Sequence, residues 1–192
     1  MRIIGIGCGP GLITVQAIEV IRQSTMILGS NRAIELVREY IPAKCEVQEI
    51  LDYRALKTLP DHAVVLSTGD PMLSGLGYLP GEVVPGISSL QLGAARLHLP
   101  LIGLLAISAH GREHQEPMRR AVEEISKGRA VCIITDPGFS LPDLANEFPK
   151  DSRARIVICQ NLGYPDECII EGTVQIPPEP SSGMYIIFII PT

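Results

Sequence analysis

The chain has 192 residues, of which 46% are hydrophobic, and a formal net charge of −5. This length accommodates one domain or two small ones, and the acidic balance without a basic tract disfavours nucleic-acid binding. No apolar run approaches the roughly 20 residues that a membrane span requires. Because Met1 and Arg2 lead directly into a strand-like run, we also expect no signal peptide and a cytoplasmic location.

Strand-like and helical patterns alternate through the first half of the chain, which predicts a mostly parallel sheet covered by helices. The expected strands are 2–6, 25–28, 45–47, 63–66 and 83–84. The expected helices are 12–22, 30–40, 52–58 and 88–97. Only 4% of the residues are aromatic, so we expect an aliphatic core, which suits a sheet of this kind.

The second half predicts a smaller, mixed sheet. The expected strands are 104–108, 129–134, 155–159, 168–174 and 184–190, with helices at 113–127 and 142–148. The last two strands flank a proline-rich turn, and we expect them to be antiparallel. The fold class is therefore α/β, with two small domains at 1–103 and 104–192.

The five cysteines are scattered and form no C-x-x-C pair, so we expect neither a disulfide framework nor a metal site. Cys132 and Cys159 fall in apolar strands, where a thiol acts as a small hydrophobe. Cys8 lies inside a glycine-rich loop, and we interpret it as part of the turn.

Three of the expected strands in the first half run into turns of small residues. Strand 2–6 feeds GIGCGPG at 5–11, strand 63–66 feeds STGDP, and Val83–Val84 feeds PGISS. Because ligands bind at the carboxyl ends of strands in open α/β sheets, these turns are candidate binding loops. Gly69 and Gly86 would let backbone approach a ligand closely. The alternative is a set of ordinary turns, in which Asp70 caps its own turn.

The first loop also resembles the dinucleotide fingerprint G-x-G-x-x-G, but the fit is poor. Gly5 and Gly7 match, whereas Pro10 stands in place of the third glycine. The acidic residue expected at the end of the second strand is missing as well, since Gly29 to Arg32 follow it. We therefore disfavour NAD binding.

Taken together, GIGCGPG, STGDPMLSG and VVPGISSLQ resemble three motifs of the tetrapyrrole methylases, which use S-adenosylmethionine (SAM). SAHGR at 108–112 and QNLGYPDE at 160–167 resemble the branch that methylates C5 of the corrin precursor cobalt-precorrin-7 in cobalamin biosynthesis. The resemblance spans nearly the whole chain and implies a cofactor cleft between the two domains. The stretch 73–82 departs from the family, whose members usually carry a longer helix and loop there.

The resemblance also implies which residues bind SAM. They are Pro10, Thr68, Gly69, Asp70, Leu73, Ser88, Ser89, Thr135 and Leu162. Transfer from an activated sulfonium needs mainly correct placement of the nucleophile, so few catalytic side chains are expected.

The candidates on the substrate and catalytic side are Asp70, His110, Arg112 and Tyr164. Asp70 is a candidate partner of the sulfonium or of the SAM amino group. Corrin precursors carry many carboxylates, so an acidic protein needs local basic groups to bind them. His110 and Arg112 are the preferred candidates for that role, because their motif follows an apolar strand.

The resemblance further implies a homodimer and a corrin-precursor substrate, while charge and hydropathy lead us to expect no nucleic-acid or membrane partner. A separate protein would then methylate C15 and remove a carboxylate. Two alternatives stay open: a methylase of this fold that acts on diphthamide or ribosomal RNA, and a non-catalytic SAM sensor.

Overall fold

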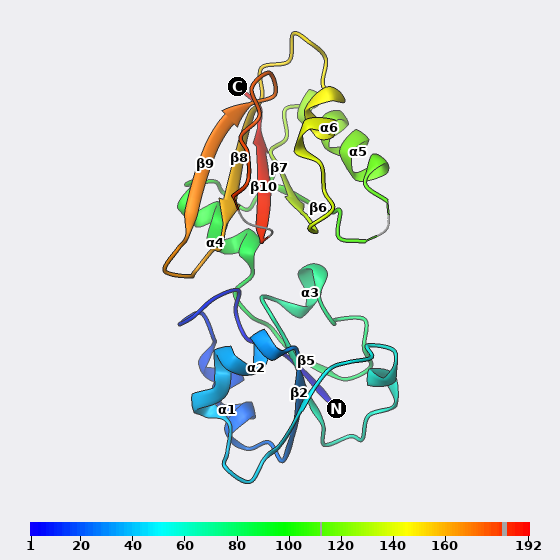
Figure 1. The fold of residues 1–192 in the computed structure, drawn as a ribbon, viewed down its shortest axis with the longest axis vertical. Coiled ribbons are helices and arrows are strands. Elements are labelled where there is room, and N and C mark those ends of the chain that lie inside the picture. Colours follow the sequence, from blue (N-terminus) through cyan, green and yellow to red (C-terminus); the bar gives the residue numbers. More distant parts are fainter. Residues whose placement is uncertain (112, 182–183) are drawn as a thin grey trace. The chain divides into compact units, whose positions relative to one another are not determined.

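The computed structural model describes residues 1–111, 113–181 and 184–192. These residues form two compact units, Met1–Ser89 and Leu90–Thr192 (Figure 1). The division falls earlier than the boundary at 103 expected from the sequence. The physical reason is helix α4 (Ser89–Arg96), which packs on the C-terminal sheet so closely that a Cβ on Gly93 would lie 2.5 Å from Cε2 of Phe188. Helix α4 therefore contributes to the core of the C-terminal unit.

The N-terminal unit contains an entirely parallel sheet in the order β3-β2-β4-β1-β5, as an alternating pattern predicts. Its strands are β1 (Arg2–Gly5), β2 (Met26–Gly29), β3 (Glu46–Glu49), β4 (Val64–Ser67) and β5 (Glu82–Val84). Its helices are α1 (Val15–Arg22), α2 (Asn31–Val37) and α3 (Pro71–Ser74), with 3₁₀ turns η1 (Arg38–Tyr40) and η2 (Ala55–Thr58).

Both faces of this sheet are covered. Neighbouring residues of each central strand point to opposite faces, so apolar side chains are present on each face. Ile4 and Val64 pack with α1 and α2, whereas Ile3 and Val65 pack with Leu56 of η2. Helix α1 begins three residues later than expected. Thr14 is its N-cap, and the Thr14 hydroxyl accepts a hydrogen bond from the backbone N–H of Ala17 at 3.1 Å.

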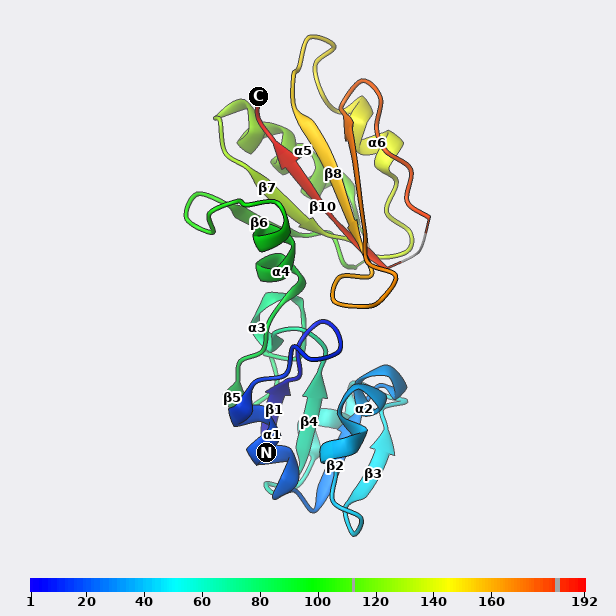
Figure 2. The same cartoon turned by 90° about the vertical axis from the view of Figure 1, so that its left-hand side faces the viewer.

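The C-terminal unit contains a mixed sheet in the order β6-β7-β10-β8-β9 (Figure 2). Its strands are β6 (Leu105–Ser108), β7 (Val131–Ile134), β8 (Arg155–Gln160), β9 (Cys168–Thr173) and β10 (Tyr185–Ile190). The β6–β7 pair is parallel, and the other pairs are antiparallel.

The expected antiparallel pairing of the last two strands is wrong. Strand β8 lies between β9 and β10 and is antiparallel to each, so β9 and β10 run in the same direction. Ile156 to Gln160 of β8 are all buried, which is typical of a strand in the interior of a sheet.

Helices cover both faces of the C-terminal sheet. Helices α5 (Gln115–Ser126) and α6 (Leu141–Asn146) lie on one face, and α4 lies on the other (Figures 1 and 2). Met118, Ala121 and Ile125 of α5 are buried, as the helical pattern predicts. Cys132 and Cys159 are buried in the sheet as small apolar groups, and burial raises the pKa of the Cys159 thiol to about 12. No helix within the described ranges has the length and apolar character needed to cross a membrane.

Candidate functional site

The three glycine-rich loops of the N-terminal unit are joined to one another at the carboxyl ends of β1, β4 and β5. Gly7 and Gly69 form an isolated bridge, in which the N–H of Gly69 donates to the carbonyl of Gly7 at 2.8 Å. The N–H of Cys8 donates to the carbonyl of Ile87 at 2.9 Å. The structure therefore brings together the loops that carry Pro10, Thr68 and Ser88.

The glycines in these loops serve two different needs. A Cβ on Gly86 would lie 2.3 Å from the carbonyl oxygen of Gly69 and 2.7 Å from the backbone of Gly5. Gly86 is thus required by the packing of the loops themselves, and the close approach of a ligand there stays a prediction. Gly69 differs, since its φ is +71° and an added Cβ would meet only Ser88 Cα, at 3.8 Å. Although Gly69 is buried, an added Cβ would therefore make a single ordinary contact, so its backbone conformation is what favours glycine there.

The carboxylate of Asp70 joins two of these loops. Its Oδ1 accepts from the N–H of Met72 at 2.7 Å and its Oδ2 accepts from the N–H of Gly86 at 3.0 Å. Asp70 is also the N-cap of α3, with Pro71 at the first helical position. The turn-capping interpretation of Asp70 therefore describes its contacts, and the second hydrogen bond adds a link to the loop after β5.

The remaining predicted residues of this unit differ in exposure. Pro10 is exposed, Thr68, Leu73 and Ser89 are half-buried, and Ser88 is buried. Arg32 near the start of α2 adds a contact not expected from the sequence, because its Nη2 donates to the carbonyl of Cys8 at 3.1 Å. This contact fixes the first loop against α2.

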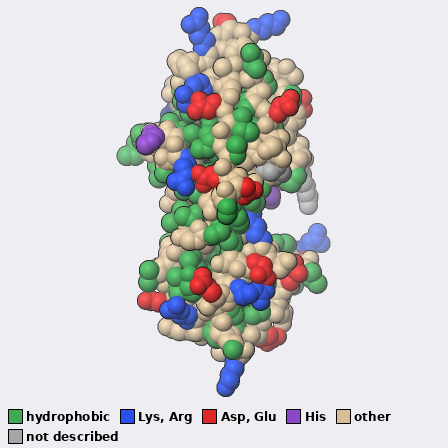
Figure 3. Space-filling view, turned by 60° about the vertical axis from the view of Figure 1, so that its left-hand side comes forward, with side chains coloured by type: hydrophobic (Ala, Val, Ile, Leu, Met, Phe, Trp, Pro, Cys, Tyr) green, Lys and Arg blue, Asp and Glu red, His purple; other side chains and the backbone are tan. Residues whose placement is uncertain are grey.

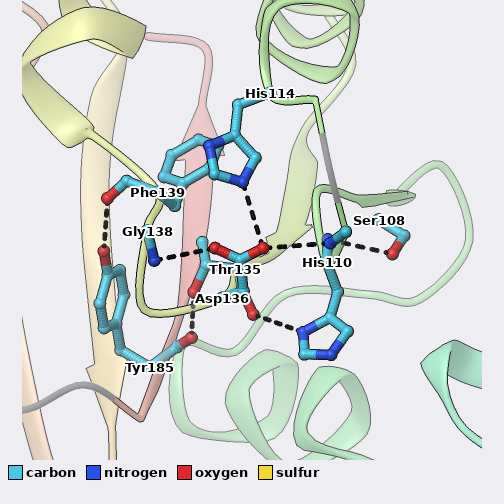
Figure 4. A network of polar contacts seen from close by, with 9 residues as sticks. Ser108, His110, His114, Thr135, Asp136, Gly138, Phe139 and Tyr185 are labelled. Carbon is cyan, nitrogen blue, oxygen red and sulfur yellow. Dashed lines mark hydrogen bonds and ion pairs between the residues drawn. The ribbon is translucent and has the colours of Figure 1, made fainter.

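In the C-terminal unit, a second carboxylate occupies a strand end (Figure 4). Asp136 follows β7. Its Oδ1 accepts from the N–H of Gly138 at 2.9 Å, and its Oδ2 accepts from the N–H of Gly111 at 3.0 Å. The Nε2 of His114 lies 3.2 Å from the same Oδ2 and must donate, since a carboxylate only accepts. The hydrogen bond from Gly111, and then that from His114, lower the pKa of Asp136 to about 2.

Sequence reasoning did not select Asp136 as a site residue. The available signal was the order of residues, because an Asp–Pro pair follows a buried strand at 70–71 and again at 136–137.

His110 and Thr135 belong to the same network. Nδ1 of exposed His110 lies 3.4 Å from the carbonyl oxygen of Thr135, so Nδ1 is the donor and Nε2 of the neutral ring keeps its lone pair. The Thr135 hydroxyl donates to the carbonyl of Tyr185 at 2.6 Å, which ties Thr135 to β10. Arg112 lies outside the described residues.

Leu162 and Tyr164 lie in a different turn, after β8. Leu162 is buried and Tyr164 is half-buried. The carboxylate of Glu167 accepts from the N–H of Gly163 at 2.7 Å and from Nε of Arg96 at 2.5 Å. The Arg96 guanidinium and the Gly163 N–H hold the pKa of Glu167 below its usual value. This pair of contacts links the turn to α4.

A parallel sheet with joined glycine-rich loops, followed by a mixed sheet with polar strand-end turns, defines an α/β protein of two units. Residues 2–177 match the family of tetrapyrrole (corrin/porphyrin) methylases. The chain belongs to this family and is a methyltransferase.

Individual relatives agree with the family. A protein of Methanocaldococcus jannaschii named as a probable cobalt-precorrin-7 C(5)-methyltransferase is 30% identical over 194 residues, covering 85% of each chain. The crystal structure of the precorrin-6Y methylase of cobalamin biosynthesis from Archaeoglobus fulgidus is 28% identical, with a TM-score of 0.74, covering 100% of this chain and 98% of that one. A uroporphyrin-III C-methyltransferase from Thermus thermophilus, complexed with S-adenosylhomocysteine, is 20% identical, has a TM-score of 0.66 and covers 98% of this chain and 97% of that one; it shares the fold.

Proposed function

We propose that this chain transfers the methyl group of SAM to C5 of cobalt-precorrin-7 in cobalamin biosynthesis. The observation that carries the proposal is the likeness to the Methanocaldococcus jannaschii relative, which bears that activity in its name and matches over 85% of both chains. The likeness to the Archaeoglobus fulgidus precorrin-6Y methylase supports the same pathway.

The N-terminal loops suit a cofactor that is bound largely by backbone groups. An added Cβ at Gly69 would meet only Ser88 Cα, at 3.8 Å, and the joined loops carry Thr68 and Ser88 beside this glycine. The Thermus thermophilus enzyme of this fold is complexed with S-adenosylhomocysteine, which is what SAM becomes after it gives up its methyl group. We assign Pro10, Thr68, Gly69, Leu73, Ser88 and Ser89 to SAM binding, with Thr135 and Leu162 from the second unit.

When bound, SAM supplies a methyl group that is already activated by the sulfonium. The residues of this chain then have to orient the corrin carbon and accept a proton, because replacing hydrogen by methyl on carbon releases one proton overall. We assign the acceptor role to Nε2 of His110, whose lone pair is directed away from the Thr135 carbonyl. Arg112 and Tyr164 are assigned to binding of the substrate.

The test is incubation of the purified chain with methyl-labelled SAM and a panel of late corrin intermediates. We expect labelled methyl to appear in cobalt-precorrin-7 and the product to carry it at C5. Binding of SAM without transfer to any substrate would favour the sensor alternative. Transfer to diphthamide or ribosomal RNA precursors alone would favour the other alternative. Sedimentation of the same preparation tests the proposed homodimer.

A further inference from the structure

The carboxylate of Asp136 holds three segments of the C-terminal unit at one point (Figure 4). Its three donors come from the turn after β7 (Gly138), from the segment after β6 (Gly111) and from the residue that precedes α5 (His114). The Asp136 side chain is only 15% exposed. The chemistry assigned above makes no use of this carboxylate.

What Asp136 holds is the segment that presents His110. Gly111 has a φ of +153°, and a Cβ there would meet no atom within 4 Å. Glycine is therefore favoured here by the backbone conformation. Because a glycine backbone can adopt many other conformations, a contact is needed to hold this one. The hydrogen bond from the Gly111 N–H to Asp136 supplies that contact, one residue away from His110.

The hydrogen bonds that His110 itself makes are longer than the bond between Gly111 and Asp136. Its ring reaches the Thr135 carbonyl at 3.4 Å, and its backbone N–H reaches the Ser108 hydroxyl at 3.4 Å. Both distances are at the long limit for a hydrogen bond, whereas bonds to a carboxylate are shorter and stronger. His114 holds the far end of the same segment against Asp136, and its ring packs against Phe139 with centroids 5.3 Å apart.

We infer that Asp136 is a positioning residue of the active site, which sets the place of the His110 imidazole through Gly111 and His114. The inference rests on the proposed function, because it assigns Asp136 a part in the reaction of the corrin substrate. It concerns this substrate step and gives Asp136 no part in SAM binding.

The decisive variant is Asp136→Asn. It keeps the size of the side chain but turns one acceptor oxygen into an N–H donor, so Gly111 and Gly138 can no longer both be satisfied. We expect kcat/KM for the corrin substrate to fall about tenfold to a hundredfold, since a misplaced catalytic group has effects of that size. The Kd for SAM should stay within about twofold. The matched control is Asp143→Asn on the exposed surface of α6, which removes the same charge and should change neither quantity.

Coupling to His110 separates positioning from a general structural role. If Asp136 acts through His110, Asp136→Asn should add no further loss of kcat/KM in a His110→Ala background. Losses that multiply in the double variant would overturn the inference. His114→Gln serves as a second variant if Asp136→Asn does not fold. It keeps the Gly111 contact, and we expect a smaller loss than that of Asp136→Asn, again absent in the His110→Ala background.

A measurement without substrate keeps this inference distinct from the proposed function. In Asp136→Asn, the Gly111 amide should exchange faster with solvent and the ring resonances of His110 should shift. If both are unchanged, Asp136 does not position His110, even in an active enzyme. If both change while the wild-type chain methylates no corrin, the positioning contact is supported and the proposed function is the part that fails.

Discussion

At the scale of single residues, Asp70 and Asp136 use the same local geometry. Each follows a strand and precedes a proline. In each, one carboxylate oxygen accepts a hydrogen bond from the N–H two residues later, that of Met72 for Asp70 and that of Gly138 for Asp136. The other oxygen accepts an N–H from the loop of another strand, Gly86 or Gly111, at 3.0 Å in both cases. A short carboxylate at a strand end can thus satisfy two loops at once.

Removal of the Asp70 carboxylate should destabilise the protein. Asp70→Ala leaves the N–H groups of Met72 and Gly86 without their acceptor, and Gly86 is buried, so we expect a loss of about 1–3 kcal/mol in the free energy of unfolding. Urea unfolding measures this loss, and Asp61→Ala at an exposed position provides the control. An unchanged stability combined with abolished SAM binding would instead favour the role of Asp70 as a partner of the sulfonium.

The Asp136 carboxylate should also shape the acid limb of stability. Its pKa is lowered from 3.8 to about 2 in the folded protein, by Gly111, His114 and Gly138, so it adds stability above pH 3.8. That contribution is lost as the pH falls from about 4 to about 2. Tyr185 is a further ionisable group near this carboxylate, and its pKa is raised by burial and by the charge of Asp136. Thermal unfolding between pH 5 and pH 2 should therefore be flatter in Asp136→Asn than in the wild type; parallel curves would contradict this account.

At the scale of elements, local sequence patterns predicted where helices and strands lie more accurately than they predicted how the strands pair. The strands and the longer helices lie within a few residues of the expected ranges, because alternation and helical periodicity are encoded locally. The order of β8, β9 and β10 depends on contacts between distant segments, and no local pattern reports it. In the same way, GIGCGPG and STGDP indicated loops at strand ends, but the bonds that join those loops depend on the sheet order.

Helix α4 illustrates this limit most clearly. The helical spacing of its apolar residues favours Leu90, Ala94 and Leu97 as the buried face, whereas the structure buries Leu92, Gly93 and Ala94. The face is shifted because Gly93 lets the helix approach the Phe188 ring. A hydrophobicity pattern assigns no weight to a glycine, so it misses a contact that depends on the absence of a side chain.

A larger side chain at this contact should therefore destabilise the C-terminal unit. In Gly93→Val, the Cβ alone would lie 2.5 Å from Cε2 of Phe188, whose ring is fully buried. We expect a loss of about 1–3 kcal/mol from overpacking. Ala95→Val on the exposed side of the same helix is the matched control. It should lower the free energy of unfolding by about 0.5 kcal/mol, which is the difference in helix propensity between Ala and Val. Equal losses in the two variants would contradict a decisive role of the Phe188 contact.

At the scale of the whole molecule, the acidic net charge opposes binding of the carboxylate-rich substrate proposed above. The net charge is −5, and on the face in Figure 3 the Lys, Arg, Asp and Glu side chains are interspersed. Recognition of a polyanion by such a protein has to come from a few placed groups, since exposed charges are screened within about 10 Å at ordinary salt. The net charge by itself therefore does not exclude a carboxylate-rich substrate.

The content of the two units also bears on the extent of the reaction. A second methyltransferase module, acting at C15 with loss of a carboxylate, would need a domain of on the order of 100–200 residues. The described residues all belong to the two units, and the glycine-rich loops of the first unit are joined into one set. In the second unit, β6 and β7 are the only parallel pair within the described ranges, and β8, β9 and β10 complete the sheet by antiparallel pairing.

We therefore expect the purified 192-residue chain to add a single methyl group and to leave every substrate carboxylate in place. The measurement is the product mass after exhaustive reaction of cobalt-precorrin-7 with excess SAM, and a reaction without SAM is the control. Addition of a separate C15-methyltransferase should then add a second methyl group and release carbon dioxide, because the first product still holds the acetate carboxyl that this step removes. A product of this chain alone that is two methyl groups heavier, or that has lost carbon dioxide, would mean that one set of loops serves both methylations.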